Sequence, residues 1–251
     1  MKATGNTILI TGGGSGIGRE LARRFHQLGN TVIVAGRTAS KLEETRQGFS
    51  EMHAQVVDVA DKSAVRGFAR ELIQQFPKLN VLINCAGMMK TEDILSDPID
   101  TEIAESTINV NLLGTIWLTT ALLPHLRQQI GATIVNVSSG LAFTPLFATP
   151  TYNATKAAIH VWSQSLRGRL NETPVEVVEI IPPGVQTDLM PGHASDPQMM
   201  PLEDFMSEAM ELFQQSPTPD EICVDRVKFL RHAELEGRLD QTMRQLNADH
   251  R

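Results

Sequence analysis

Aromatic residues are scarce in this sequence of 251 residues: they make up 5%, and there is a single tyrosine. The two cysteines, Cys85 and Cys223, are too few for a disulfide framework. We find no secretory signal, no apolar run long enough to span a membrane and no run of Lys or Arg. Together with a net charge of -7, these absences argue against nucleic acid or a membrane as partner. We therefore expect a soluble, cytoplasmic protein.

Positive charge is concentrated at the start of the chain. Residues 1–50 contain seven Lys or Arg and three Asp or Glu, a balance of +4 that leaves -11 for the remainder. This balance favours a bound polyanion near the N-terminus, although a solvated basic face on two helices has the same composition.

The sequence has no group of histidine, cysteine and carboxylate residues with the spacing of a metal site. Its histidines are scattered at His26, His53, His125, His160, His193, His232 and His250. We predict no structural or catalytic metal, and we expect Cys85 to be a small buried apolar residue.

Short β-branched runs alternate with amphipathic stretches over residues 1 to 190. The runs are Thr7 to Thr11, Thr31 to Ala35, Gln55 to Val59, Val81 to Asn84, Thr133 to Val137 and Val175 to Ile181. This alternation predicts an α/β fold with one doubly wound parallel sheet and helices on both faces. A chain of this length with 41% hydrophobic residues can bury one such core, so we expect residues 1–251 to form a single domain. In such sheets, ligands bind at the edge where the strands have their carboxyl ends.

The first run leads into a glycine-rich segment, Thr11 to Gly18. Glycine lets the backbone turn sharply and approach a phosphate, and a helix that begins there offers unpaired N–H groups. A helical pattern that ends at Gly29 follows directly. The segment is therefore a candidate pyrophosphate site, with a mobile glycine turn as the alternative.

The only tyrosine, Tyr152, stands four residues before Lys156 and thirteen after Ser139. On a helix, the four-residue step places the phenol and the ammonium group on one face. A nearby positive charge lowers the pKa of a phenol from its ordinary value of about 10, so the pair favours proton transfer nearer neutral pH. Taken alone, the spacing also fits a tyrosine at the core edge and a solvated lysine.

Six motifs occur in a fixed order between residue 5 and about residue 190. They are Gly12, Gly16 and Gly18; Asp58; Asn84-Cys85-Ala86-Gly87; Asn111; Ser139, Tyr152 and Lys156; and Pro183-Gly184-Val185-Gln186-Thr187. In this order and spacing, the sequence resembles the short-chain dehydrogenases/reductases, which share the Rossmann fold. Its C-terminal part is similar to the DltE-like branch of that family.

The resemblance implies a catalytic set of four residues. Tyr152 would transfer the proton, and Lys156 would bind the nicotinamide ribose and lower the tyrosine pKa. Ser139 would orient the substrate carbonyl or alcohol, since the family's usual step to the tyrosine favours it over Ser138. Asn111 would hold a water that extends the proton relay through Lys156; a helix-bending asparagine satisfied by backbone is the alternative.

The resemblance also implies a cofactor site along the strand ends. Asp58 would bind the adenine amino group and Val59 would add a backbone contact, unless Asp58 only caps the helix that begins near Ser63. Thr187 would contact the carboxamide. Cys85 replaces the family's usual second asparagine, which we expect to alter local packing only. The expected cofactor residues are Gly12, Ser15, Gly16, Ile17, Gly18, Arg37, Lys41, Asp58, Val59, Asn84, Ala86, Gly87, Tyr152, Lys156, Pro183, Gly184, Val185 and Thr187.

The end of the second predicted strand bears on the choice of cofactor. NAD sites usually have an acid about 20 residues past the glycine loop, which accepts the ribose hydroxyls. Here the sequence reads Val34-Ala35-Gly36-Arg37-Thr38, without an acid. Arg37 can bind a 2′-phosphate with its planar fork, and Lys41 adds charge one helical turn further. We predict NADP(H), with NAD(H) less favoured; an ordinary surface arginine is the alternative for Arg37.

Residues 188–215 follow the sixth predicted strand, where the family has its substrate lid. Methionines such as Met190 and Met199 suit a loose apolar pocket, whereas Phe205, Ala209 and Phe213 have the helical spacing of a packing face. We expect a small-molecule carbonyl or alcohol as the substrate.

The C-terminal part departs from the family pattern. Residues 221 to 235 read as a helix and residues 236 to 251 are polar, so we expect the family's seventh strand to be short or absent. Because that strand contributes to a tetramer interface in the family, we predict a homodimer built from the helices around Leu112 to Leu126 and Tyr152 to Leu170.

The predicted function is that of an NADP(H)-dependent oxidoreductase acting on CH–OH or C=O groups, with carbonyl reduction favoured. An NAD-linked alcohol dehydrogenase differs from it in cofactor and direction. A non-catalytic NADP(H)-sensing regulator is the alternative of another class. All four catalytic positions are filled, which favours an enzyme.

Overall fold

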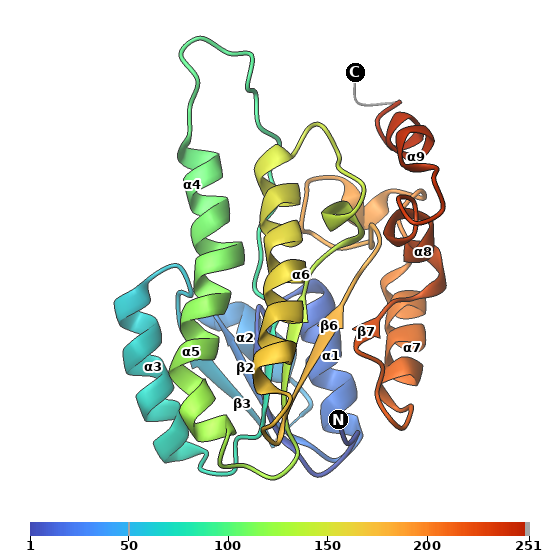
Figure 1. Cartoon of the computed structure of the whole chain (residues 1–251). Coiled ribbons are helices and arrows are strands. Elements are labelled where there is room, and N and C mark those ends of the chain that lie inside the picture. Colours follow the sequence, from blue (N-terminus) through green and yellow to red (C-terminus); the bar gives the residue numbers. More distant parts are fainter. Residues whose placement is uncertain (50, 249–251) are drawn as a thin grey trace.

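The fold is known from a computed structural model that describes residues 1–49 and 51–248 (Figure 1). Seven parallel strands form one sheet in the order β3-β2-β1-β4-β5-β6-β7. Their bounds are β1 (Thr7–Thr11), β2 (Thr31–Gly36), β3 (Met52–Val56), β4 (Val81–Asn84), β5 (Ala132–Val137), β6 (Val175–Ile180) and β7 (Glu221–Ile222). The predicted α/β fold with a doubly wound parallel sheet is confirmed.

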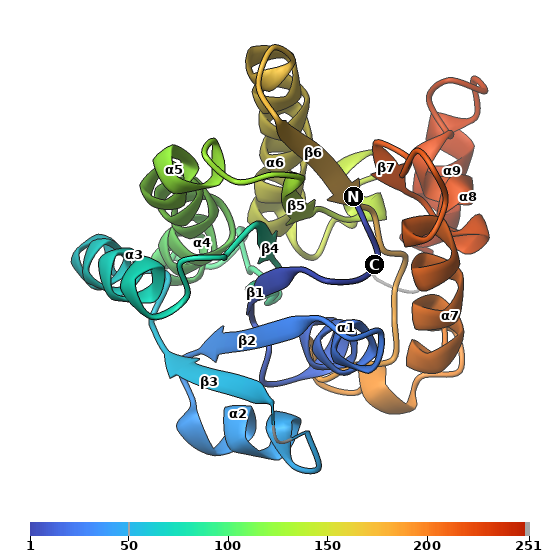
Figure 2. The same cartoon turned by 90° about the horizontal axis from the view of Figure 1, so that it is seen from below.

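Helices cover both faces of the sheet, as Figure 2 shows. The α-helices are α1 (Gly16–Gln27), α2 (Ala39–Arg46), α3 (Lys62–Gln75), α4 (Glu102–Ile108), α5 (Gly114–Leu126), α6 (Pro150–Leu170), α7 (Leu202–Phe213), α8 (Asp225–Arg231) and α9 (Leu239–Leu246). Helices α1 and α7 lie on one face, and α3, α5 and α6 lie on the other.

Successive residues of the strands point to opposite faces, which divides the core into two apolar layers. In β1, Ile8 and Ile10 pack toward α1 and α7, whereas Leu9 packs toward α3 and α5. Both faces are covered, so the central strands β1, β4 and β5 are apolar on both sides. This explains why they read as continuous β-branched runs.

Five of the six predicted strands agree with the structure to within one residue at each end, and two expectations are corrected. The third strand is Met52–Val56, not Gln55 to Val59. It pairs with β2 in a register that runs from Met52 opposite Val32 to Val56 opposite Gly36. Residues 221 to 235 are not one helix. Glu221–Ile222 pairs with the end of β6 as a short seventh strand, and α8 begins at Asp225.

A long helical run, Glu102–Leu126, contains α4, a π-helical turn η1 (Asn109–Leu113) and α5. By length and composition it could cross a membrane, a feature that the sequence analysis missed because polar residues interrupt it. In the fold this run packs against α3 and α6, and the buried Leu118 and Leu122 contribute to the core.

The predicted lid segment, residues 188–215, consists of two different parts. Its first part is a loop with the turn η3 (His193–Ser195), and Met200 pairs through its backbone with Gly184 and Gln186. Its second part is α7, whose Phe205, Ala209 and Phe213 are fully buried against α1. The packing-face interpretation therefore holds for α7; the role of the segment as a lid and the single-domain organisation stay predictions.

We expect Phe213→Ala to lower the free energy of unfolding by about 3–5 kcal/mol, because it removes a buried ring that packs edge-on against Phe25 at 5.4 Å. Urea denaturation measures this, with the exposed Leu235→Ala as control, expected to change it by about 0.5 kcal/mol at most. Equal effects of the two variants would show that α7 is a detachable lid and not part of the core.

Candidate active site

A cavity of about 840 Å³ opens at the carboxyl ends of the central strands. Its wall includes Ser139 at the end of β5 and Tyr152 and Lys156 on α6. The other predicted residues that line it are Gly12, Ser15, Gly16, Ile17, Gly18, Gly87, Pro183, Gly184, Val185 and Thr187. The strand ends thus bring motifs from distant parts of the sequence to one place, as expected for this class of sheet.

A smaller hollow of about 190 Å³ adjoins the first at the other end of the glycine-rich segment. Gly12, Ser15 and Gly87 line both cavities. The remaining predicted residues of the second hollow are Arg37, Lys41, Asp58, Val59 and Ala86. Together the two cavities form an elongated site, wide enough at one end for a substrate beside a cofactor.

Glycine is required in the segment before α1 because neighbouring backbone passes very close. A side chain at Gly18 would place its Cβ 2.4 Å from the Gly12 carbonyl oxygen, and one at Gly12, where φ is +67°, would meet the Ala86 backbone at 2.9 Å. Ser15, at the N-cap of α1, makes no side-chain capping bond, and the first turn has no acid. The N-terminal N–H groups and the positive end of the helix dipole therefore remain available to a phosphate.

Arg37 and Lys41 lie at the mouth of the smaller hollow. Within residues 1–49 and 51–248 neither residue forms an ion pair, whereas Arg19, Arg23 and Arg46 each pair with a nearby glutamate. Two exposed cations at this point favour an anion such as a 2′-phosphate.

Asp58 also lines the smaller hollow, and its alternative role as a helix cap is wrong. Asp61 caps α3, because its carboxylate accepts from the N–H groups of Ser63 and Ala64 at 2.8 and 3.1 Å. Among residues 1–49 and 51–248, the Asp58 carboxylate accepts only from the Ala60 N–H, at 2.9 Å. One of its oxygens is therefore free to face the hollow.

Tyr152 and Lys156 share one face of α6, as the four-residue spacing predicts. Each is only 5% exposed, and the Lys156 Nζ lies 5.5 Å from the centre of the tyrosine ring. Lys156 donates a hydrogen bond of 2.8 Å to the Val137 carbonyl at the end of β5. The interpretation of Lys156 as a solvated lysine is therefore wrong.

The expected lowering of the tyrosine pKa is not seen in the cofactor-free protein. Burial raises the pKa of Tyr152 to about 12, while its hydrogen bond with Ser139 acts in the opposite direction. Burial also lowers the pKa of Lys156 to about 8, against the smaller effects of Cys85 and Glu179. Desolvation penalises the charged form of each group, and here it outweighs the opposing effects of Ser139 on the tyrosine and of Cys85 and Glu179 on the lysine.

The two adjacent serines at the end of β5 point to different places. Ser139 lies beside the Tyr152 hydroxyl, and its Oγ accepts from the Leu141 N–H at 3.1 Å. Ser138 donates to the buried carboxylate of Glu179 at 2.5 Å. The structure therefore places Ser139 beside the tyrosine and gives Ser138 an internal partner.

Two predicted residues lie behind the cavity wall. Asn111 lies in the π-helical turn η1, and its side chain accepts from the Met88 N–H at 2.8 Å and donates to the Met88 carbonyl at 2.9 Å. These two bonds fix the loop that follows β4. Asn84 donates to Thr119 and Asn136, each at 2.9 Å, inside the core. Neither residue lines either of the two cavities described above, and their direct roles toward a cofactor or water stay predictions.

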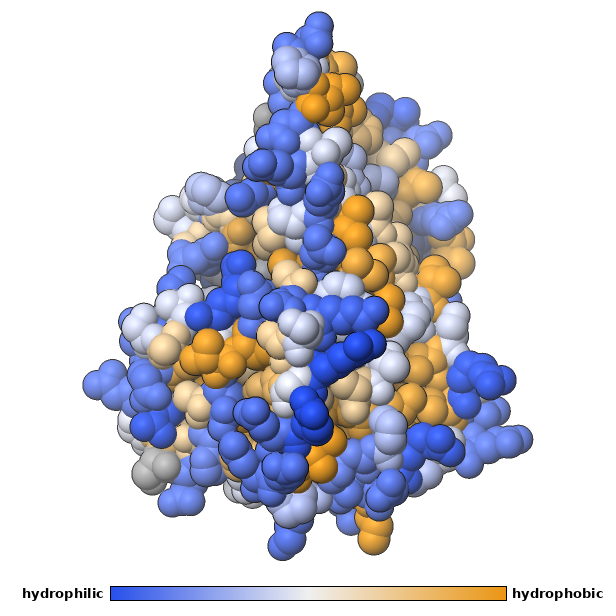
Figure 3. All heavy atoms as spheres, turned by 90° about the vertical axis from the view of Figure 1, so that its left-hand side faces the viewer, coloured by the Kyte–Doolittle hydropathy of each residue, from blue (hydrophilic) through white to orange (hydrophobic). Residues whose placement is uncertain are grey.

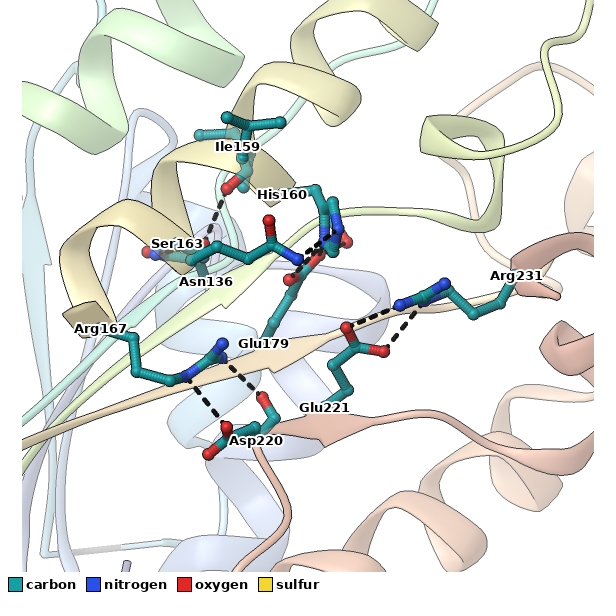
Figure 4. A network of polar contacts seen from close by, with 12 residues as sticks. Asn136, Ile159, His160, Ser163, Arg167, Glu179, Asp220, Glu221 and Arg231 are labelled. Carbon is teal, nitrogen blue, oxygen red and sulfur yellow. Dashed lines mark hydrogen bonds and ion pairs between the residues drawn. The ribbon is translucent and has the colours of Figure 1, made fainter. Parts of the chain in front are cut away.

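The fold also joins three residues that the sequence keeps far apart: His160, Glu179 and Glu221 lie within 4.8 Å of one another (Figure 4). Each already has a partner. The His160 Nδ1 lies 2.9 Å from a Glu179 oxygen, and Arg231 forms two bonds of 3.0 Å with Glu221. The guanidinium group thus neutralises the charge of Glu221. The expectation of no metal stays a prediction.

Several lining residues come from parts of the chain that the sequence analysis did not connect to the site. Phe229 and Leu230 of α8 and Gln245 and Leu246 of α9 line the large cavity. The polar pattern of residues 236 to 251 does not indicate that this part of the chain lines the cavity. Cys85 lines the cavity as well and is half-buried rather than buried; burial raises its thiol pKa to about 11, so it is neutral near pH 7.

Comparison with known proteins agrees with this geometry. The family model for short chain dehydrogenases matches residues 6–198. This chain belongs to the short-chain dehydrogenase family. The match spans the glycine-rich segment, Ser139, Tyr152 and Lys156, and it ends before α7.

Among relatives of this short-chain dehydrogenase is the uncharacterized oxidoreductase DltE of Bacillus subtilis (strain 168), which is 44% identical over 189 residues, or 75% of each chain. A solved structure of serine dehydrogenase complexed with NADP+ is 25% identical, with a TM-score of 0.75 over 83% of this chain and 89% of that one. A short-chain dehydrogenase/reductase of Burkholderia phymatum in complex with NAD, 20% identical, superposes with a TM-score of 0.82 over 96% of both chains. The last similarity shows the fold alone.

The burial of Lys156 predicts a pH dependence of stability for this short-chain dehydrogenase. Its pKa falls from 10.5 in the unfolded chain to about 8 in the fold, so the unfolded state binds more protons between these values. Stability therefore rises with pH in this window, relative to a Lys156→Met variant that buries no charge. From about pH 7.5 to about pH 10, we expect the difference between the two to change by about 2 kcal/mol in favour of the wild type.

Urea denaturation of both proteins at each pH measures this difference, and groups common to the two cancel. A difference that does not vary with pH would mean that Lys156 keeps an ordinary pKa in the fold.

Proposed function

We propose that this protein is an NADP(H)-dependent carbonyl reductase in which Tyr152 is the proton donor. One observation carries the proposal: Ser139, Tyr152 and Lys156 line a large cavity that the glycine-rich segment also lines. A regulator that only senses the cofactor has no need of this buried acid–base pair beside space for a second ligand.

The residues present fit a dinucleotide cofactor. The uncapped N-terminus of α1 and the close backbone approach at Gly12 and Gly18 suit a pyrophosphate, and the smaller hollow suits an adenosine. When bound, nicotinamide supplies the hydride at its C4 atom. Arg37 and Lys41 would hold a 2′-phosphate, and the NADP+ complex of serine dehydrogenase supports this choice.

The chain's own groups handle the proton. A phenol with a raised pKa stays protonated over the physiological range, which suits Tyr152 to donate to an alkoxide that develops in the cavity. Ser139, beside the phenol, orients the substrate oxygen by a hydrogen bond. Lys156, with a pKa of about 8, is mostly charged near neutral pH and stabilises negative charge on the phenol oxygen as the proton leaves.

We also propose that the protein acts in the cytoplasm as a homodimer. Apolar side chains are exposed on α4 and α6, at Ile108 and Val161. Others lie on the projecting loop after β4, where Ile94, Leu95 and Ile99 are exposed, and Figure 3 shows apolar atoms at this tip of the molecule. Exposed apolar patches favour association with another surface.

We expect Tyr152→Phe to lower kcat at least about 100-fold while leaving the Kd for NADPH within about twofold, because the variant removes the transferable proton and little else. NADPH fluorescence titration and NADPH oxidation with a panel of aldehydes and ketones measure the two quantities. Tight NADPH binding by the wild type without turnover of any panel compound would favour the sensor function and contradict the proposal.

Arg37→Ser should weaken NADPH binding roughly 10- to 100-fold, since a charge-assisted hydrogen bond contributes about 1.5–3 kcal/mol. NADH binding should change by less than about threefold, because NADH lacks the 2′-phosphate. Arg46→Ser is the matched control: Arg46 is an exposed arginine at the end of α2, the helix that follows Arg37, and it pairs with Glu43. Equal losses for NADPH and NADH would assign Arg37 no part in the choice of cofactor.

A further inference from the structure

The C-terminal helices α8 and α9 reach back over the loop of residues 140–149, which joins Ser139 to Tyr152 (Figure 1). They lie beyond residue 198, where the match to the family model ends. The two helices contact the loop at successive points, so this part of the chain contributes to the walls of the cavity.

Helix α8 packs directly on the turn after Ser139. A Cβ at Gly140 would meet the side chains of Leu230 and Val227 of α8 at 2.8 and 2.9 Å, so a larger residue would force these side chains to shift. The buried Thr144 donates to the Leu230 carbonyl at 3.0 Å. Arg231 lies 4.3 Å from the centre of the Phe143 ring.

The same arginine ties α8 to the sheet. Its two bonds to Glu221 of β7 are visible in Figure 4, and both side chains are largely buried. A two-pronged arginine–carboxylate pair fixes orientation as well as distance. Helix α8 is thus held in one position relative to the end of β5.

Helix α9 is fastened to the next part of the loop by Asn247, which is 3% exposed. Its Oδ1 accepts from the Phe147 N–H at 2.7 Å, and its Nδ2 donates to the Pro145 carbonyl at 3.1 Å. These two bonds enclose Leu146, and they give the loop on both sides of it a fixed partner.

Leu246 directly precedes Asn247 and lies near Tyr152. It packs on a small apolar cluster of Met89, Leu146 and Tyr152, and it lines the cavity. The other members of that cluster, Leu141, Ala148 and Met190, are apolar too. Charged residues of the cavity, such as Asp188 and Arg226, are not members of the cluster.

We propose that Leu246 is a specificity-determining residue of the substrate chamber and that Asn247 is the residue that positions it. The chamber selects carbonyl compounds that carry an unbranched apolar chain, because the side chains that pack with Leu246 and Tyr152 are all apolar: Met89, Leu141, Leu146, Ala148 and Met190. The inference deepens the proposed function and rests on it for the reaction. The binding of the apolar chain, however, can be tested without turnover.

The test uses straight-chain primary alcohols of increasing length as ligands of the full-length protein, with Kd measured by calorimetry. In the wild type, each added methylene should tighten binding roughly 3- to 4-fold until the chain reaches Leu246, because each buried methylene contributes about 0.8 kcal/mol. Leu246→Ala should move this limit to chains longer by about two carbons, and Leu246→Trp to shorter ones. Arg244→Ala, an exposed change on the same helix, should leave the series as it is.

Asn247 is tested by the same series and by hydrogen exchange. Asn247→Ala should speed exchange of the Phe147 amide at least about tenfold and flatten the dependence of Kd on chain length. Asn247→Asp retains the acceptor for Phe147 and should restore most of the protection.

A Kd independent of chain length, or a limit that Leu246→Ala and Leu246→Trp leave unchanged, would overturn the inference. These binding results do not depend on turnover. Absence of NADPH oxidation would therefore contradict the proposed function, whereas the inference about Leu246 would be judged from the Kd values alone.

Discussion

Lys156 is buried together with its ammonium group, which donates a hydrogen bond to the Val137 carbonyl. This burial follows from the position of α6, which lies across the ends of β5 and β6. It also fixes the charge states of the site. Desolvation raises the pKa of Tyr152 and lowers that of Lys156, so that each group tends toward its neutral form.

The residues around this pair are held by the sheet rather than by mobile loops. Thr11 at the end of β1 accepts from the N–H groups of Cys85 and Ala86, each at 3.1 Å, and so joins the ends of two strands. Asn84 and Asn136 connect β4 to β5 in the core. The outer wall differs, because α8 and α9 are fastened by a few polar bonds. The site thus has an inner wall held by the sheet and an outer wall that is fastened separately.

The sequence predicts much of this arrangement and misses identifiable parts. The strands with β-branched runs and the glycine-rich segment are local patterns, and they hold in the structure. Tyr152 and Lys156 share a helix, so their spacing alone places them together. The third strand was misplaced because Val57 and Val59 read as strand, although they follow its end. The seventh strand has two residues and depends on pairing with β6, a contact with no local signal.

The pKa of Tyr152 was predicted in the wrong direction for a related reason. Spacing shows which charge is near the phenol, but the extent of burial depends on the packing of the whole site. The cluster of His160, Glu179 and Glu221 and the reach of Leu246 to the cavity likewise come from tertiary contacts between residues far apart in sequence.

The central claim is that desolvation governs the catalytic pair, and the single tyrosine allows a direct test. Protein labelled with ¹³C at the tyrosine Cζ gives one resonance, whose position reports the ionisation of Tyr152 as the pH is raised. The account predicts that in the cofactor-free protein this resonance remains that of a neutral phenol at about pH 10, where an ordinary tyrosine is half ionised. A transition to phenolate below about pH 9 would contradict it, because the charge of Lys156 would then outweigh burial.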